Sequence, residues 1–129
     1  MRALERWHHM MKQGSSEGLM ELLHEDCVFW SPVVHTPQHG RAITHAYLSA
    51  AQQVFSTDFH YVREVVQGDH AILEFECLMD DVKVNGVDMI TVLGDQIIEF
   101  KVMVRPLKAV NKVHEKMMAM LEQMKAAAG

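Results

Sequence analysis

Residues 84–104, VNGVDMITVLGDQIIEFKVMV, constrain the fold more than any other segment. Two runs rich in Val, Ile and Met flank Gly94-Asp95, a pair that is typical of a hairpin turn. Side chains alternate faces along a strand, so every second residue shares a face. One face of this hairpin and of the preceding run is almost entirely apolar, with Ala71, Leu73, Phe75, Cys77, Val84, Gly86, Asp88, Ile90, Ile98, Phe100, Val102 and Val104. We predict that this face packs on a hydrophobic core.

Asp88 is the one acidic residue on this predicted apolar face. A carboxyl group in apolar surroundings has a raised pKa unless a partner charge or a hydrogen-bond donor offsets the loss of hydration. Perturbed carboxyl groups are common at functional sites, which makes Asp88 the first functional candidate. The alternative interpretation is an aspartate near a strand end that reaches solvent or caps a backbone amide.

The remaining patterns predict one α+β domain. In chain order they indicate a helix over 2–12, a short helix from Ser15 or Ser16 to 23, a strand over 27–31, a loop to 40, a helix over 41–55, strands over 59–66 and 70–79, the hairpin, and a helix over 107–127. In the third helix the residues expected to face inward are Ile43, Ala46, Tyr47, Ala50, Ala51 and Val54.

The last predicted helix has an apolar stripe at spacings of three and four, formed by Leu107, Val110, His114, Met117, Leu121 and Met124. Such a stripe packs on its own domain or on a partner subunit. The outer sheet face mixes charges of both signs with Leu78, Val87, Met89 and Met103. Its apolar content favours a subunit interface, and a solvated sheet is the alternative.

The bulk properties exclude several classes of partner. The net charge of −5 argues against nucleic acid or an anionic membrane as the main partner. No apolar run is long enough to span a bilayer, and no secretory signal is evident. We therefore expect a cytoplasmic protein with Cys27 and Cys77 as buried free thiols.

Sequence motifs for nucleotide binding, zinc proteases and serine hydrolases are absent from the chain. His35 and His39 lie four residues apart in a proline-containing loop, where that spacing does not align their side chains. A metal site needs three or four converging ligands, and only these histidines with Asp88 could be assembled. We expect no metal and no cofactor.

Several segments carry a resemblance to a known family. The run 23–32, LHEDCVFWSP, precedes His39-Gly40-Arg41 at the start of a helix, and Val87-Asp88 precedes a turn and a β-rich run. These features and the order of elements resemble the nuclear transport factor 2-like superfamily, including ketosteroid isomerase, SnoaL-type polyketide cyclases and limonene epoxide hydrolase. The resemblance, which covers about residues 3–105, implies a cone-shaped, curved mixed or antiparallel sheet around N-terminal helices. We expect this domain to span 1–106 and the last predicted helix to form a C-terminal helical extension over 107–129, outside the resemblance. The resemblance also implies a conical pocket and a homodimer.

The resemblance to ketosteroid isomerase implies roles for individual residues. The oxyanion-hole acid of that enzyme falls on Asp88, where an apolar pocket keeps the acid protonated so that it donates a hydrogen bond. The oxyanion-hole tyrosine falls near Trp7, and the catalytic base falls on Ser31, which cannot shuttle protons in that role. The arginine of limonene epoxide hydrolase falls on Gly86. Polyketide cyclases use a single acidic residue as both acid and base. Of the three activities, theirs therefore needs the fewest catalytic residues from this chain.

Two functional hypotheses follow. One is an acid-base isomerase, cyclase or hydrolase that binds a small hydrophobic molecule and uses Asp88, with Trp7 or a histidine such as His35 as the assisting donor. The other is a non-catalytic binding module or dimeric scaffold. In both, the predicted pocket lining comprises Phe29, Ser31, His39, Tyr47, Leu73, Phe75, Val84, Phe100, Val102 and Val104.

Overall fold

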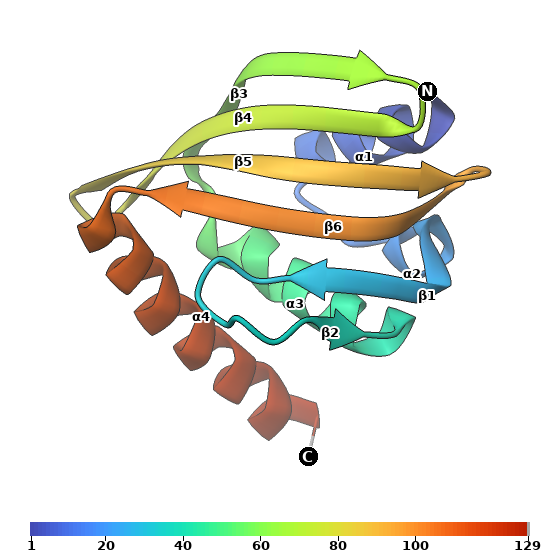
Figure 1. Cartoon of the computed structure of the whole chain (residues 1–129). Coiled ribbons are helices and arrows are strands. Elements are labelled where there is room, and N and C mark those ends of the chain that lie inside the picture. The colour runs from blue at the N-terminus through green and yellow to red at the C-terminus, as the bar shows by residue number, and fades with distance from the viewer. Residues whose placement is uncertain (129) are drawn as a thin grey trace.

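A curved six-stranded sheet with four helices on one face forms the protein in the computed structural model, which describes residues 1–128 (Figure 1). The elements are α1 (Arg2–Gln13), α2 (Leu19–Leu22), β1 (Leu23–Trp30), β2 (Gln38–His39), α3 (Arg41–Val54), β3 (Thr57–Gln67), β4 (His70–Met79), β5 (Val82–Leu93), β6 (Gln96–Arg105) and α4 (Leu107–Ala128). None of the described helices is long and apolar enough to cross a membrane. The predicted α+β class is confirmed.

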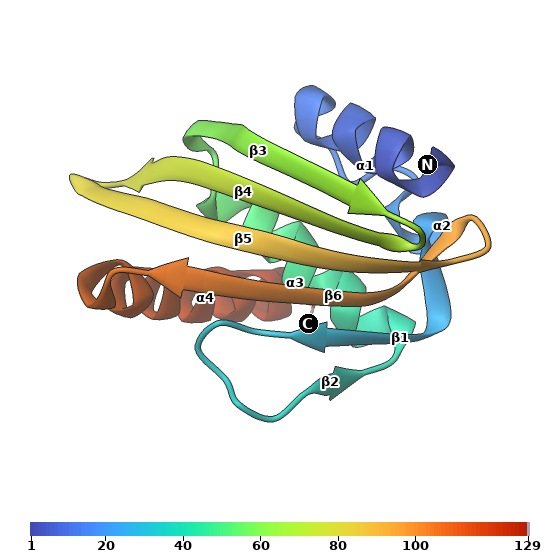
Figure 2. The same ribbon diagram turned by 45° about the horizontal axis from the view of Figure 1, so that its top comes forward.

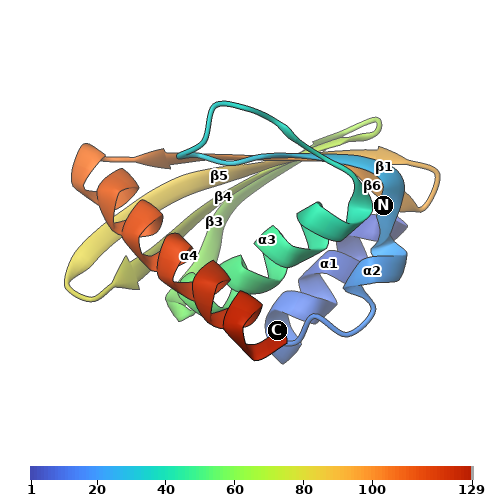
Figure 3. The same cartoon turned by 90° about the horizontal axis from the view of Figure 1, so that it is seen from below.

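The strands follow the order β2-β1-β6-β5-β4-β3, side by side in Figure 2. Every neighbouring pair is antiparallel except β1 and β6, which run parallel. From below, α1, α2, α3 and α4 lie together under the concave side of the sheet (Figure 3). The predicted curved mixed sheet around helices is therefore correct. The core lies between these two layers.

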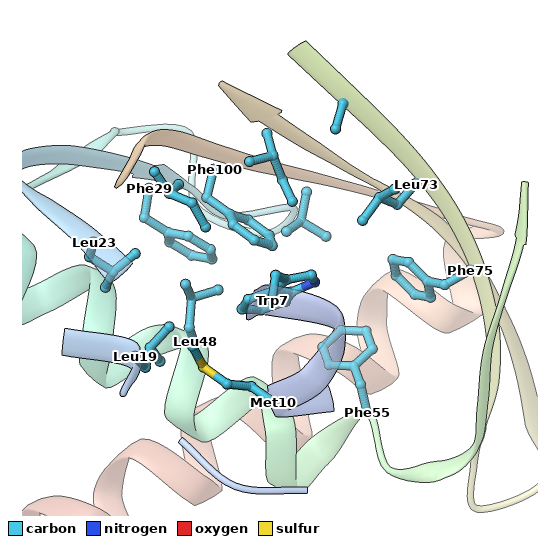
Figure 4. Close-up of a cluster of buried hydrophobic side chains, with 14 of the residues drawn as sticks. Trp7, Met10, Leu19, Leu23, Phe29, Leu48, Phe55, Leu73, Phe75 and Phe100 are labelled. Atoms are coloured by element: carbon cyan, nitrogen blue, oxygen red, sulfur yellow. The ribbon is translucent and has the colours of Figure 1, made fainter. Parts of the chain in front are cut away.

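The predicted core face of the strands is buried almost completely. The exposed fraction is 5% or less for Ala71, Leu73, Phe75, Cys77, Val84, Ile90 and Phe100, and 9% for Val102. Val104, near the end of β6, is half-buried against the same core. On α1, Ala3, Leu4, Trp7 and Met10 are buried in the core, and Figure 4 shows Trp7 beneath Phe100 of the sheet and Met10 beside Leu48 of α3.

A β-bulge corrects the prediction for Ile98. Thr91 pairs with Glu99 but Val92 pairs with Ile97, so Ile98 is the extra residue between them. The bulge reverses the alternation on β6, and Ile97 rather than Ile98 is fully buried. A period-two pattern does not reveal where such an extra residue is inserted.

Close packing explains why β5 carries a glycine at position 86. A Cβ atom at this position would clash with the ring of Phe75 and lie 2.7 Å from the carbonyl oxygen of Met103. The absence of a side chain therefore lets the Phe75 ring cover the strand. Where the resemblance to limonene epoxide hydrolase placed an arginine, Gly86 leaves space for the Phe75 ring.

The helix faces agree only in part with those predicted. On α3, Ala50 is buried as predicted and Tyr47, Ala51 and Val54 pack against the core, but Thr44 and Leu48 are also buried and Ile43 is 36% exposed. On α4, Met117, Leu121 and Met124 of the predicted stripe pack inward, but the inward stripe begins with Ala109 and Val113, and Leu107 is 75% exposed.

The physical reason is that two apolar stripes overlap on each helix, and periodicity alone does not choose between them. Ala109, near the start of α4, is fully buried.

Three predicted element boundaries were also wrong. The second helix is shorter than predicted, with its N-cap at Gly18. β1 begins at Leu23, which pairs with Ile97 on β6, so the polar residues 24–26 belong to the strand and do not precede it. The predicted loop contains the short strand β2, in which His39 pairs with Val28.

The outer face of the sheet carries polar pairs across strands. Arg63 Nε lies 3.5 Å from Glu74 Oε1, and Trp30 Nε1 donates to Glu99 Oε2 at 2.9 Å. Lys101 Nζ lies 4.5 Å from the centroid of the Trp30 ring. These contacts pair several of the charged groups among the apolar residues of that face.

Candidate functional site

A cavity of about 50 Å³ lies between the sheet and the helices. Its walls are mostly aromatic and aliphatic, and every helix except α2 contributes to them. The lining residues are Trp7, Met11, Phe29, Ser31, Pro32, Leu48, Ala51, Gln52, Phe55, Phe59, Phe75, Asp88, Phe100, Val102, Val113 and Met117. Figure 4 shows Trp7 beside Phe100, with ring centroids 5.0 Å apart, and Phe55 beside Phe75.

Asp88 is the one charged side chain in this lining, as far as the structure describes the chain. It lies in the middle of β5 between Leu73 on β4 and Val102 on β6, and it is only 6% exposed. Burial raises the pKa of its carboxyl group to about 7, although a hydrogen bond from Tyr61 favours the charged form and lowers the pKa. The alternative of an Asp88 that reaches solvent is therefore excluded.

Tyr61, on β3, is the hydrogen-bond partner of Asp88. Its hydroxyl donates to Asp88 Oδ2 at 2.8 Å, and Trp7 Nε1 donates to the hydroxyl oxygen of Tyr61 at 3.0 Å. Burial, followed by the nearby Asp88 carboxylate, raises the Tyr61 pKa well above its ordinary value. Tyr61 therefore acts as a neutral donor. The indole of Trp7, predicted as the donor to a ligand, is directed at Tyr61 instead.

Sequence reasoning missed Tyr61, although a signal was present. The strand over residues 59–66 was expected, and alternation places Phe59 and Tyr61 on the same face. Pairing of Tyr61 with Phe75 would then have directed this face toward the core.

The predicted pocket residues divide into two groups. The cavity lining includes Trp7, Phe29, Ser31, Phe75, Asp88, Phe100 and Val102, and does not include His35, His39, Tyr47, Leu73, Val84 and Val104. His35 and His39 are exposed, because the loop and β2 lie at the sheet edge. Tyr47 stacks behind Phe29, with ring centroids 5.2 Å apart.

Two helices contribute lining residues that the sequence did not indicate. Gln52 on α3 lines the cavity, and its Nε2 donates to the carbonyl oxygen of Ser15 at 2.9 Å. Val113 and Met117 on α4 form part of the same wall. α4 is thus both a packing element and a cavity wall.

Ser31 supplies a hydroxyl group where the resemblance to ketosteroid isomerase placed a base. Its Oγ accepts the backbone N–H of Val33 at 3.1 Å. A serine in this position lacks a group that takes up a proton near neutral pH. Any acid-base chemistry in the cavity therefore depends on Asp88.

The other chemically reactive groups lie in unfavourable surroundings. Burial raises the pKa of both Cys27 and Cys77 to about 11, so their thiolate forms are scarce at neutral pH. Within residues 1–128, no three His, Cys, Asp or Glu side chains converge as a metal site would require.

Comparisons with known proteins place these features in a family. The SnoaL-like domain matches residues 4–100. A crystal structure of a steroid delta-isomerase from Pseudomonas aeruginosa has 34% sequence identity and a TM-score of 0.92, covering 96% of this chain and 92% of that chain. No curated protein sequence matches the chain.

Two further crystal structures agree with this assignment. An uncharacterised protein with a cystatin-like fold from Silicibacter pomeroyi is 33% identical, with a TM-score of 0.84, and covers 92% of this chain and 85% of that chain. A nuclear transport factor 2-like protein from Mesorhizobium loti, 24% identical with a TM-score of 0.73, covers 81% and 88% and shares the fold. The chain therefore belongs to the SnoaL-like domain family, within the nuclear transport factor 2-like fold.

Proposed function

We propose that this protein is an acid-base enzyme of the isomerase or cyclase type that uses one carboxyl group on a small hydrophobic carbonyl compound. The observation that carries the proposal is the buried Asp88 in an apolar cavity, with a pKa of about 7. A catalytic acid or base works best when its pKa lies near the operating pH, because both protonation states are then accessible. No cofactor is needed for this chemistry.

The reaction has two proton transfers. Ionised Asp88 takes a proton from a carbon next to the substrate carbonyl, which leaves an enolate and a neutral carboxylic acid. The acid then returns the proton to another carbon, and the carboxylate is restored. The aromatic walls exclude water, which strengthens the electrostatic interactions within the cavity.

The likeness to the Pseudomonas aeruginosa protein supports the isomerase class, because that protein is named a steroid delta-isomerase. Ser31 distinguishes this chain from the ketosteroid isomerase pattern. Asp88 would accordingly serve as base and acid in turn, rather than as an oxyanion-hole donor beside a separate base.

Hydrogen exchange in D₂O tests the proposal without knowledge of the natural substrate. The protein is incubated with a panel of apolar ketones, including a 5-ene-3-ketosteroid, and deuterium uptake is followed by mass spectrometry. We expect exchange with at least one ketone and a loss of about 100- to 10,000-fold in Asp88→Asn. Asp81→Asn, an exposed aspartate in the β4–β5 turn, is the matched control.

A non-catalytic binding module is the second candidate, and Ser31 in place of a base is the observation that favours it. In that case the protein retains an apolar ligand, detected by native mass spectrometry, without exchange of its hydrogens. Asp88→Asn would then change affinity only modestly. Exchange that is equal in Asp88→Asn and in the unaltered protein would refute the catalytic proposal.

We also infer a homodimer through the outer sheet face and a cytoplasmic location. Met103 and Ile72 on that face are 52% and 36% exposed in the single chain, and Val65 is 53% exposed. The two buried free thiols fit a reducing compartment. Sedimentation of Met103→Glu, which places a charge in the apolar patch, is expected to shift the mass from two chains toward one. A monomer before substitution would refute the dimer.

A further inference from the structure

We propose that Tyr61, oriented by Trp7, is the positioning residue of Asp88, and that it holds Oδ2 so that Oδ1 is the oxygen that exchanges a proton with the substrate. The catalytic part of this inference rests on the proposed function. The positioning part rests on the two hydrogen bonds that join α1, β3 and β5.

The direction of these hydrogen bonds follows from the chemistry of the groups. An indole nitrogen only donates, so the Tyr61 oxygen must accept from Trp7 Nε1. A phenol has one hydrogen, and here that hydrogen is directed at Asp88 Oδ2. Trp7 thus occupies one acceptor site of the Tyr61 hydroxyl group. This favours the orientation in which the hydroxyl hydrogen is directed at Asp88.

The same geometry distinguishes the two oxygens of the carboxyl group. Oδ2 accepts from the Tyr61 hydroxyl when Asp88 is ionised. In the neutral acid the carbonyl oxygen is the better acceptor, so a proton on Oδ1 preserves the hydrogen bond from Tyr61, whereas a proton on Oδ2 weakens it. The hydrogen bond from Tyr61 therefore favours proton uptake at Oδ1.

The ring of Tyr61 is fixed by its neighbours. Phe59 and His8 meet it edge-on, with ring centroids at 5.1 Å and 5.5 Å. His8 Nε2 lies 2.6 Å from Glu64 Oε1, which ties α1 to β3 next to the tyrosine. The hydroxyl group is consequently held at Asp88 by packing as well as by Trp7.

Few charged groups face the pair from the surrounding elements. In the described cavity lining, α3, α4, β1, β4 and β6 contribute no charged side chain. Besides Asp88, the carboxylate that raises the Tyr61 pKa is Glu64, which pairs with His8. The hydrogen bond from Tyr61 is therefore the main polar influence on Asp88 apart from its burial.

Titration of Asp88 by carbon NMR tests the positioning role without any substrate. Aspartate labelled at the carboxyl carbon is used, and the Asp88 signal is identified by its loss in Asp88→Asn. Tyr61→Phe removes the donor and keeps the ring, so we expect the titration midpoint to rise by about one pH unit. Trp7→Phe should raise the midpoint less, because the hydroxyl remains but is no longer oriented. Tyr47→Phe, which removes the other tyrosine hydroxyl of the chain, should leave the midpoint unchanged.

The catalytic consequence has a separate readout. If the ionised carboxylate is the base, its concentration sets the exchange rate. A rise of one unit in the Asp88 pKa from about 7 lowers the ionised fraction at pH 7 from about one half to about one eleventh. The exchange rate of Tyr61→Phe should therefore fall about fivefold. The loss should disappear above pH 9, which a merely structural defect would not produce.

The outcomes separate the two proposals. A midpoint in Tyr61→Phe equal to that of the unaltered protein, with Tyr61→Phe folded, would overturn the positioning role. If Tyr61→Phe does not fold, Trp7→Phe must raise the midpoint for the role to stand. A raised midpoint in a protein that exchanges no ketone hydrogen would support the positioning of Asp88 and overturn its assignment to proton transfer.

Discussion

Replacing Asp88 by asparagine is expected to stabilise the protein at pH 8 and to leave its stability near pH 4 almost unchanged. In the folded protein the pKa of this carboxyl group is about 7, against an ordinary value of 3.8. The folded state therefore holds the proton more tightly than the unfolded chain between these two values. By linkage, the contribution of Asp88 to stability falls as the pH rises from about 4 to about 7, and it is constant above.

The magnitude follows from the pKa difference. Each pKa unit corresponds to about 1.4 kcal/mol, so ionised Asp88 costs on the order of 4 kcal/mol at pH 8. Asparagine has a similar shape and offers an oxygen to the Tyr61 hydroxyl, but it carries no charge to desolvate. For a chain of 129 residues, a gain of this size raises Tm by about 15 °C.

Urea unfolding at several pH values measures this difference. Trp7 is 4% exposed in the core, which makes tryptophan fluorescence a direct probe of unfolding. The free energy of unfolding of Asp88→Asn should exceed that of the unaltered protein increasingly from pH 4 to pH 8, whereas Asp81→Asn should follow the unaltered protein. Parallel curves for Asp88→Asn and the unaltered protein between pH 4 and pH 8 would refute the argument that desolvation controls Asp88.

Three further changes test the packing around the cavity. Gly86→Ala should destabilise the fold by about 1–3 kcal/mol in urea unfolding, because the added Cβ overlaps the ring of Phe75; an unchanged midpoint would contradict this packing. Cys27 and Cys77, with pKa values of about 11, should react with a thiol reagent at pH 8 far more slowly in the folded protein than in urea, and equal rates would show that they are accessible. Met117→Ala should cost about 2 kcal/mol and enlarge the cavity, seen as tighter binding of bulkier apolar ligands than in the unaltered protein.

The sheet was predictable from the sequence because each inward residue lies two positions from the next. That alternation identified Asp88 as a carboxyl group on a core face, and the structure buries it there. The bulge at Ile98 was not predictable, because an extra residue leaves no mark in hydrophobicity. The inward face of α4 was predicted for Met117, Leu121 and Met124 but not for its first turns, where Ala109 and Val113 are buried instead of Leu107.

The candidate site was predictable only in part, because it joins segments that are distant in the chain. Trp7 and Tyr61 are 54 residues apart, and their hydrogen bond depends on how α1 lies against β3. The resemblance to ketosteroid isomerase led to Trp7 as the donor to a ligand and gave no reason to examine Tyr61. His35 and His39 lie outside the cavity lining because their loop lies at the edge of the sheet.

The cavity walls differ in how freely they can vary during evolution. Residues on β4, β5 and β6 are paired to strands on both sides, so a change there disturbs neighbours in the sheet. α4 contributes Val113 and Met117 from outside the sheet, and Lys112 and Lys116 bind it to Asp80 in the β4–β5 turn. Divergence of ligand preference among related chains should therefore concentrate on α4, while the pair formed by Asp88 and Tyr61 is preserved.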